Sequence, residues 1–118
     1  MSESARAEVV RRFAAAFATC DVDAIVDSVD DGVVWELNGR KVGESSTAFA
    51  EQMRTDLSAG SAEVTIEQLI EDGDTVVALN RGRFVPHDGG EAAQFVSAEV
   101  YTFAGDTITR IRTYQSLG

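Results

Sequence analysis

Apolar side chains in the first half of the chain recur at helical spacing. Within residues 5–18 the large apolar residues fall on one face and charged residues occupy much of the rest, which predicts an amphipathic helix. Asp21 is placed to cap a second, short helix whose apolar stripe runs to Val29 and ends in the turn at residues 30–32. The two helices are expected to form a hairpin. The apolar positions of the first helix are Val9, Val10, Phe13 and Phe17.

A short strand and a third helix follow this hairpin. Residues 33–37 are β-branched and aromatic, and the turn-forming pair Asn38 and Gly39 comes directly after them, so we expect a strand and a chain reversal. One of residues 45–47 caps the third helix, which ends near Gly60. Its apolar face consists of Phe49, Ala50, Met53 and Leu57.

The second half of the chain changes to a period of two. Turn signals rich in Gly and Asp separate the segments, so the pattern predicts an antiparallel meander. Helices followed by strands indicate an α+β fold, with three N-terminal helices packed on a curved antiparallel sheet. Because the sequence has no repeat and no flexible linker, we expect residues 1–118 to form a single domain. The predicted strands are residues 64–70, 75–85, 92–103 and 107–115.

Composition and charge narrow the classes of partner. The chain has 20 acidic and 10 basic side chains, a formal net charge of −10, which repels nucleic acid and anionic membrane surfaces. No segment approaches the ~20 apolar residues of a membrane helix, and the N-terminus lacks the pattern of a signal peptide. Cys20 is the only cysteine, so an internal disulfide and a cysteine-based zinc site are excluded, and a cytoplasmic location is expected.

Three segments carry a resemblance to a known superfamily: residues 20–26 (CDVDAIV), residues 30–36 (DDGVVWE), and the closing VYTF at 100–103 with ITRI at 108–111. With the order of elements, they resemble the nuclear-transport-factor-2-like superfamily and its SnoaL-like and ketosteroid-isomerase-like members. The resemblance implies a cone-shaped roll that encloses an apolar pocket, and a homodimer formed through the outer face of the sheet. The superfamily includes isomerases, cyclases, dehydratases, epoxide hydrolases and non-catalytic proteins, so the fold alone does not fix the function.

Two glutamates fall where the ketosteroid isomerases have catalytic carboxyls. Glu36 corresponds to the base on the short strand, and Glu99 to a carboxyl that helps to hold an enolate oxygen. Desolvation in an apolar wall raises the pKa of a carboxyl, so one such group can act as a base and another as a neutral hydrogen-bond donor. The resemblance therefore implies proton transfer, of isomerase or cyclase type, on a small apolar molecule that contains a carbonyl group, with no cofactor.

The expected ligand-binding residues surround Glu99. Its strand face also carries Phe95, Ser97 and Tyr101, and the resemblance adds residues from the first helix and the last strand. The helix position where the isomerases have an oxyanion-hole tyrosine holds Phe13, which has no hydrogen to donate. The other expected ligand-binding residues are Phe17 and Gln115.

Other interpretations of these residues remain open. Glu36 on an edge strand is also consistent with a side chain in solvent. Glu99 has arginines on neighbouring strands, and pairing with Arg83 or Arg112 would imitate part of an epoxide hydrolase site. A non-catalytic ligand-binding or dimerisation domain is the third alternative. His87 lies in a predicted turn, and no ligand cluster for a metal accompanies it.

Overall fold

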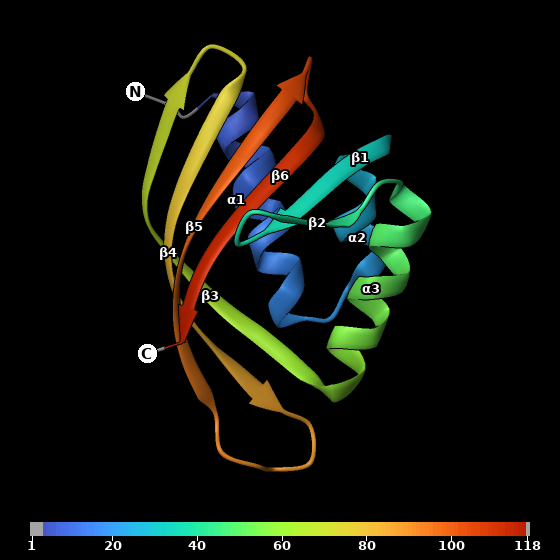
Figure 1. Cartoon of the computed structure of the whole chain (residues 1–118). Helices are drawn as coiled ribbons and strands as arrows, with labels where there is room; N and C mark the ends of the chain where they lie inside the picture. The colour runs from blue at the N-terminus through green and yellow to red at the C-terminus, as the bar shows by residue number, and fades with distance from the viewer. Residues whose placement is uncertain (1–3, 118) are drawn as a thin grey trace.

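Three helices lie against the inner face of a six-stranded sheet whose long strands curve around them (Figure 1). The structure, a computed structural model, describes residues 4–117. The predicted α+β architecture is confirmed. The elements are α1 (Ala5–Ala18), α2 (Val22–Asp27), β1 (Val29–Leu37), β2 (Arg40–Gly43), α3 (Ser46–Ala59), β3 (Gly60–Asp72), β4 (Thr75–Pro86), β5 (Ala93–Ala104) and β6 (Thr107–Leu117).

Each helix begins at a polar side chain that accepts a hydrogen bond from the first turn. The Ser4 hydroxyl caps α1, the Asp21 carboxylate caps α2 by accepting from the backbone N–H of Ala24 at 3.1 Å, and the Ser45 hydroxyl caps α3. Such caps satisfy backbone donors that have no partner within the helix. The predicted bounds of α1 and the predicted cap of α2 are confirmed.

The predicted end of the second helix is wrong. Helix α2 ends at Asp27, and residues 30–32, expected to form a turn, belong to β1. Val29 pairs with Ile108 of β6, and the backbone N–H of Ile108 donates to the carbonyl oxygen of Ser28 at 2.9 Å. Long-range pairing with β6 therefore extends the strand through a segment whose local sequence favours a turn.

The strands are ordered β2-β1-β6-β5-β4-β3. Hairpins join β3 to β4, β4 to β5 and β5 to β6, as the meander predicted. The expectation of an antiparallel sheet fails at one pair, because β1 runs parallel to β6. Asn38 and Gly39 both have positive φ, 50° and 84°, and reverse the chain between β1 and β2 as expected.

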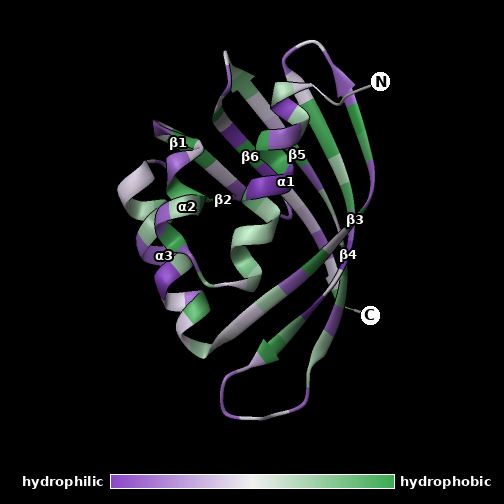
Figure 2. Cartoon of the chain, turned by 180° about the vertical axis from the view of Figure 1, so that it is seen from behind, coloured by the Kyte–Doolittle hydropathy of each residue, from purple (hydrophilic) through white to green (hydrophobic). Residues whose placement is uncertain are grey.

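The core lies between the helices and the inner face of the sheet. Apolar residues alternate with polar ones along the strands (Figure 2). The buried apolar residues of the strands form one cluster with those of the helices. The two halves of the chain meet in this core, which keeps the helices on one side of the sheet. None of the described helices has the length and apolar character needed to cross a bilayer. The largest fully buried side chains are Tyr101, Ile25, Ile108, Val10, Val33 and Val76.

Arg6 fastens the start of α1 to two hairpin turns. Its Nε donates to the carbonyl oxygen of Gly105 and its Nη1 to that of Gly73, both at 2.8 Å. Its guanidinium also lies 5.7 Å from the centre of the Phe103 ring. These contacts hold the start of α1 against one end of the sheet.

Candidate active site

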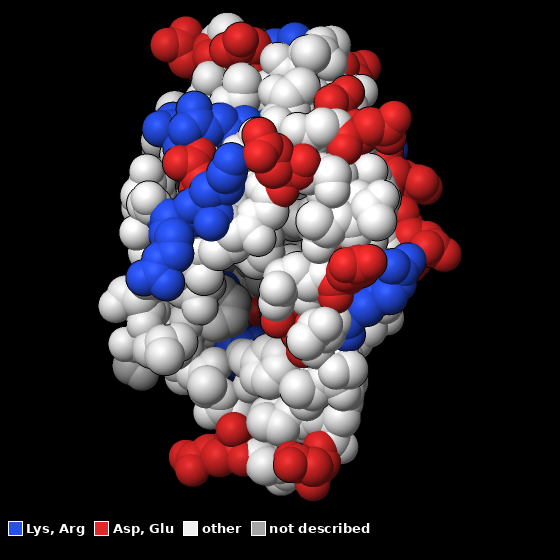
Figure 3. All heavy atoms as spheres, turned by 45° about the vertical axis from the view of Figure 1, so that its right-hand side comes forward, with Lys and Arg blue, Asp and Glu red and all other residues white. Residues whose placement is uncertain are grey.

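A cavity of about 590 Å³ lies between the helices and the sheet. This volume is in the range of small-molecule sites. Its walls come from α1, α3 and every strand except β2, so segments distant in sequence must fold together to form it. Figure 3 shows a hollow near the centre of the molecular surface that is turned toward the viewer.

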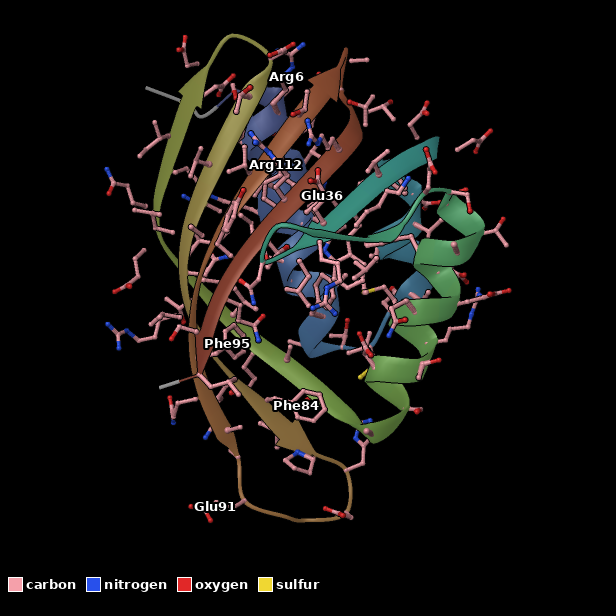
Figure 4. The ribbon with its side chains drawn as sticks, viewed as in Figure 1. Arg6, Glu36, Phe84, Glu91, Phe95 and Arg112 are labelled. Carbon is pink, nitrogen blue, oxygen red and sulfur yellow. The ribbon has the colours of Figure 1, made fainter. Side chains whose placement is uncertain are left out.

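Most of the cavity wall is apolar and aromatic. Phe13 and Phe17 meet edge to face, with ring centres 5.3 Å apart, and Trp35 meets Phe49 edge to face at 5.5 Å. Phe84 and Phe95 line the lower part of the cavity, close to the β4–β5 hairpin (Figure 4). Rigid rings at these positions define a dry surface suited to an apolar ligand.

Glu99 is the carboxyl that the sheet presents to this cavity. Its place in β5 is set by pairing with Ala78 of β4 and Thr113 of β6. The Tyr101 hydroxyl, two residues further along the same face, donates a hydrogen bond to Glu99 Oε2. Tyr101 is almost completely buried and does not itself line the cavity. Its role is therefore to hold the Glu99 carboxyl through this hydrogen bond.

Burial changes the acidity of this pair. Desolvation raises the pKa of Glu99, and the hydrogen bond from Tyr101 opposes that rise. Burial and the neighbouring Glu99 also raise the pKa of Tyr101 well above its usual value, so the phenol stays a hydrogen-bond donor. The pair therefore presents a carboxyl with weakened acidity to an apolar cavity, which suits proton transfer.

Thr113 and Gln115 add polar groups to the same wall. The indole Nε1 of Trp35 donates to the Thr113 hydroxyl oxygen at 3.3 Å, which leaves the hydroxyl hydrogen of Thr113 available to another acceptor. Thr113 is the β6 partner of Glu99, and Gln115 lies two residues further along β6. Hydrogen-bond donors thus stand beside the carboxyl, where a ligand oxygen can be held.

Glu36 does not face the cavity. Trp35 and Leu37 line it, and because successive residues of a strand point to opposite faces, Glu36 points outward. Arg110 Nη2 lies 2.5 Å from Glu36 Oε2, and Arg112 is the register partner of Glu36 on β6 (Figure 4). The prediction that Glu36 lies in the pocket is therefore wrong. Glu36 instead forms an ion pair with Arg110 on the outer face of the sheet.

The proposed pairing of Glu99 with an arginine is also absent from the described residues. Arg83 pairs with Glu63 at 2.8 Å, and Arg112 is not among the residues that line the cavity. The contact that the Glu99 carboxyl makes is with Tyr101. The partial imitation of an epoxide hydrolase site is therefore not formed.

The other expected site residues divide into two groups. Phe13, Phe17, Phe95 and Gln115 line the cavity. Ser97 and Tyr101 do not line it. The Ser97 hydroxyl accepts a hydrogen bond from Asn80 Nδ2 at 3.3 Å, and the Tyr101 hydroxyl donates one to Glu99. Both residues thus lie next to the cavity and not on its surface.

His87 holds the β4–β5 turn against the end of α3. Its Nε2 lies 2.9 Å from the carbonyl oxygen of Leu57, and its backbone N–H donates to the carbonyl oxygen of Ala59. Among residues 4–117, no group of three or more His, Cys, Asp or Glu side chains is arranged to hold a metal ion.

Several lining residues escaped the analysis of the sequence. Placing Glu36 in the pocket implied that Trp35, the adjacent residue of the strand, points to the other face, although two large apolar residues flanking one charge indicate the reverse. Thr113 carried no signal, since a threonine in a strand is ordinary. Leu37, Met53 and Phe84 are further examples.

The raised pKa of Glu99 predicts a pH dependence of stability. The folded state holds this proton more tightly than the unfolded state, so the free energy of unfolding should fall as pH rises from about 4.3, the usual glutamate value, through the folded-state pKa. Each pH unit over which only the folded state keeps the proton costs about 1.4 kcal/mol. Urea denaturation of the wild type and Glu99→Gln at several pH values checks this: the variant should lack that decline.

Glu91, exposed in the β4–β5 hairpin, supplies the matched control. Glu91→Gln removes the same formal charge at a surface position, and it should keep the wild-type pH dependence. Parallel curves for the wild type and Glu99→Gln would contradict the assignment of a desolvated carboxyl.

The geometry can be compared with known proteins. The sequence model of a family described as the SnoaL-like domain matches residues 10–111. The search of curated proteins finds no match. Among solved structures, an LEH-like epoxide hydrolase of M. tuberculosis is similar, with a TM-score of 0.85 and 22% sequence identity over 95% of this chain and 83% of that one.

Two further structures show the same fold. A putative isomerase from Bacillus subtilis has a TM-score of 0.83 and 17% identity, over 95% of this chain and 86% of its own. A computationally designed 17-OHP binder has a TM-score of 0.85 and 17% identity, over 98% of this chain and 100% of its own. At such low identity the likeness establishes the fold and leaves the activity to the site.

Proposed function

Because the chain belongs to the SnoaL-like domain family, we propose that it binds a small, apolar, carbonyl-containing molecule in its cavity and moves a proton on that molecule with Glu99. The reaction is of isomerase or cyclase type. It needs no cofactor, because the same carboxyl accepts the proton and returns it.

The observation that carries this proposal is one half-buried carboxyl in a mostly apolar cavity. Tyr101 occupies Glu99 Oε2, and Glu99 is itself among the lining residues, so its other oxygen is the one available to a ligand. A carboxylate in such surroundings is a stronger base than in water because it is poorly solvated. The designed 17-OHP binder, which has the same fold, supports the use of this fold for binding small molecules.

The proposed reaction proceeds through an enolate. The Glu99 carboxylate takes a proton from the carbon next to the carbonyl, and the electron pair of the broken C–H bond moves toward the carbonyl oxygen. Thr113 and Gln115 are placed to donate hydrogen bonds to that oxygen, a role that Phe13 has no donor to fill. Glu99 then returns the proton to the same carbon or to a conjugated one, which leaves the atoms balanced.

Binding is tested with 2-tetralone, a neutral bicyclic ketone. Trp35 is the only tryptophan and lines the cavity, so its fluorescence should change saturably as 2-tetralone is added. Ala93→Trp places a large side chain at an exposed position of the cavity wall, and it should abolish the saturable response. Gln94→Trp, at the neighbouring position on the opposite strand face, is the matched control and should keep the wild-type affinity. Because both variants add a second tryptophan, their affinities for 2-tetralone are measured by calorimetry.

Catalysis is tested by hydrogen exchange on the same ketone. In D2O, the protein should accelerate exchange of the protons next to the carbonyl of 2-tetralone, measured by proton NMR, and Glu99→Gln should lower that acceleration by about 10²–10⁴-fold. Binding without accelerated exchange would overturn the catalytic part and favour a non-catalytic ligand-binding domain. Absence of binding would overturn the proposal as a whole.

A further inference from the structure

The titratable side chains that line the cavity are all acidic. Glu99 lies on the sheet, and Asp56 lies at an exposed position on α3. Among the lining residues in the described part of the chain there is no Lys, Arg or His. When these carboxyls are ionised, a ligand in the cavity therefore meets a field that favours positive charge and opposes negative charge.

Three arginines of the sheet are instead paired with glutamates on its outer face. Arg110 pairs with Glu36, Arg83 with Glu63, and Arg81 lies 3.7 Å from Glu67. Figure 3 shows basic side chains gathered in a band to one side of the hollow. These cations do not offset the carboxyls inside the cavity, because their charge is already compensated by an acidic partner.

Aromatic rings reach the cavity from both of its walls. Two come from α1 and one from α3 on the helical side, and three come from strands β1, β4 and β5. Perpendicular pairs, with interplanar angles of 74° for Phe13 with Phe17 and 88° for Trp35 with Phe49, turn ring faces in different directions. Several ring faces around one cationic group, with a carboxyl nearby, are the arrangement that binds organic ammonium ions. The six rings belong to Phe13, Phe17, Trp35, Phe49, Phe84 and Phe95.

We propose that the cavity selects its apolar ligands by charge, accepting molecules that carry an ammonium group and excluding those that carry a carboxylate. This inference rests on the proposed use of the cavity for ligand binding. It narrows the substrate class from apolar carbonyl compounds in general to neutral and cationic ones, with an ammonium group adding affinity.

Binding of a cation should also release a proton from the protein. A positive charge beside Glu99 favours its ionised form, so a ligand with a fixed positive charge displaces the proton that desolvation holds there. The Tyr101 hydroxyl from β5 donates a hydrogen bond to Glu99. The other titratable group among the lining residues is the Asp56 carboxyl on α3, whose Oδ1 accepts a hydrogen bond from Gln52 Nε2 at 2.9 Å. The lining residues of α1, β1 and β6 are uncharged.

The test uses three ligands that share the tetralin skeleton. They are 2-(trimethylammonio)tetralin, its neutral isostere 2-tert-butyltetralin, and tetralin-2-carboxylate, and calorimetry in two buffers of different ionisation enthalpy gives affinity and proton release together. The ammonium compound should bind about tenfold more tightly than the tert-butyl compound and should release protons at pH values where Glu99 is still protonated in the free protein, and the carboxylate should show no saturable binding.

Variants assign the selectivity to residues. Glu99→Gln should remove the proton release and most of the tenfold preference, and Asp56→Asn should remove a smaller part. Asp88→Asn, which removes one negative charge in the exposed β4–β5 turn, should leave the preference unchanged.

The outcomes separate the two proposals. Equal affinity for the ammonium and tert-butyl compounds, or saturable binding of the carboxylate, would overturn charge selection and leave the binding of neutral ketones intact. Failure of 2-tetralone and 2-tert-butyltetralin alike to bind would overturn the proposed function itself. A preference for the ammonium compound that survives Glu99→Gln and Asp56→Asn would overturn the assignment to the lining carboxyls.

Discussion

Replacing Phe13 with alanine should lower the free energy of unfolding by about 3–5 kcal/mol. Its side chain is only 3% exposed. Its ring contacts three others, with centres at 5.3 Å for Phe17, 6.2 Å for Phe49 and 5.7 Å for Tyr101. It therefore joins both long helices to the sheet, and its removal takes contacts from every layer. Urea denaturation followed by far-ultraviolet circular dichroism measures the change.

Two other variants make this result interpretable. Phe17→Ala removes the same group from a partly buried position on the same helix, so it should cost less. Phe13→Leu retains most of the buried area and should cost less than Phe13→Ala. A loss below about 1 kcal/mol for Phe13→Ala would mean that this ring does not join the helices to the sheet.

Gly82→Ala should lower the free energy of unfolding by about 1–3 kcal/mol, because its backbone lies directly under another ring. A Cβ at this position would lie 2.4 Å from Cζ of Phe95 and 2.7 Å from the backbone oxygen of Glu63. The Phe95 ring can move, but only into the cavity that it lines, whereas the Glu63 oxygen is fixed in the β3–β4 pairing. The variant should thus lose both stability, measured by urea denaturation, and affinity for 2-tetralone.

The two close contacts can be separated in a double variant. In a protein that already carries Phe95→Ala, Gly82→Ala no longer meets the ring and meets only the Glu63 oxygen. In that background Gly82→Ala should therefore cost less stability than it does in the wild type, but it should still cost some. Gly43→Ala is the control, since a Cβ there has nothing within 4 Å, and its effect should stay within about 0.5 kcal/mol. An equally small effect at Gly82 would contradict the tight packing of Phe95 on β4.

Local signals in the sequence were sufficient for most of the fold. The apolar spacing of residues 5–18 and the capping side chain of Asp21 act within a few residues, and they predicted the start of each of the first two helices. Asn38 and Gly39 adopt positive φ at low cost, which is why this turn was visible without any knowledge of its partners.

Pairing between distant strands was not predictable in the same way. The choice of β6 as the parallel partner of β1 depends on which strand edge remains after the meander has formed, and no local pattern records it. The pairing of β1 with β6 also brings Glu36 next to Arg110 and Arg112, so the ion pair of Glu36 with Arg110 could not be predicted from local sequence either. The resemblance to the isomerases placed Glu36 in the pocket, where the alternation of Trp35, Glu36 and Leu37 indicated the outer face.

Glu99 shows what alternation along a strand can and cannot supply. Its shared face with Phe95 predicted a position at the cavity wall, and both residues are found there. The same face also carries Tyr101 and Ser97, which are buried and do not line the cavity, because the helices that pack over a curved sheet decide which of its residues stay accessible. Sequence spacing thus predicts the side of a strand, and tertiary packing decides which residues of that side reach a ligand.

The parallel joint between β1 and β6 also bears on how the chain reaches this state. The hairpins of the meander close short loops, whereas the pairing of Val34 with Arg110 requires the chain to bring together segments from its two halves, which costs more entropy. We therefore expect the cavity wall to close in a late kinetic step. Trp35 reports on it directly, because its indole meets both Phe49 and Thr113. In stopped-flow refolding, its fluorescence should reach the native value after the circular dichroism signal of the strands.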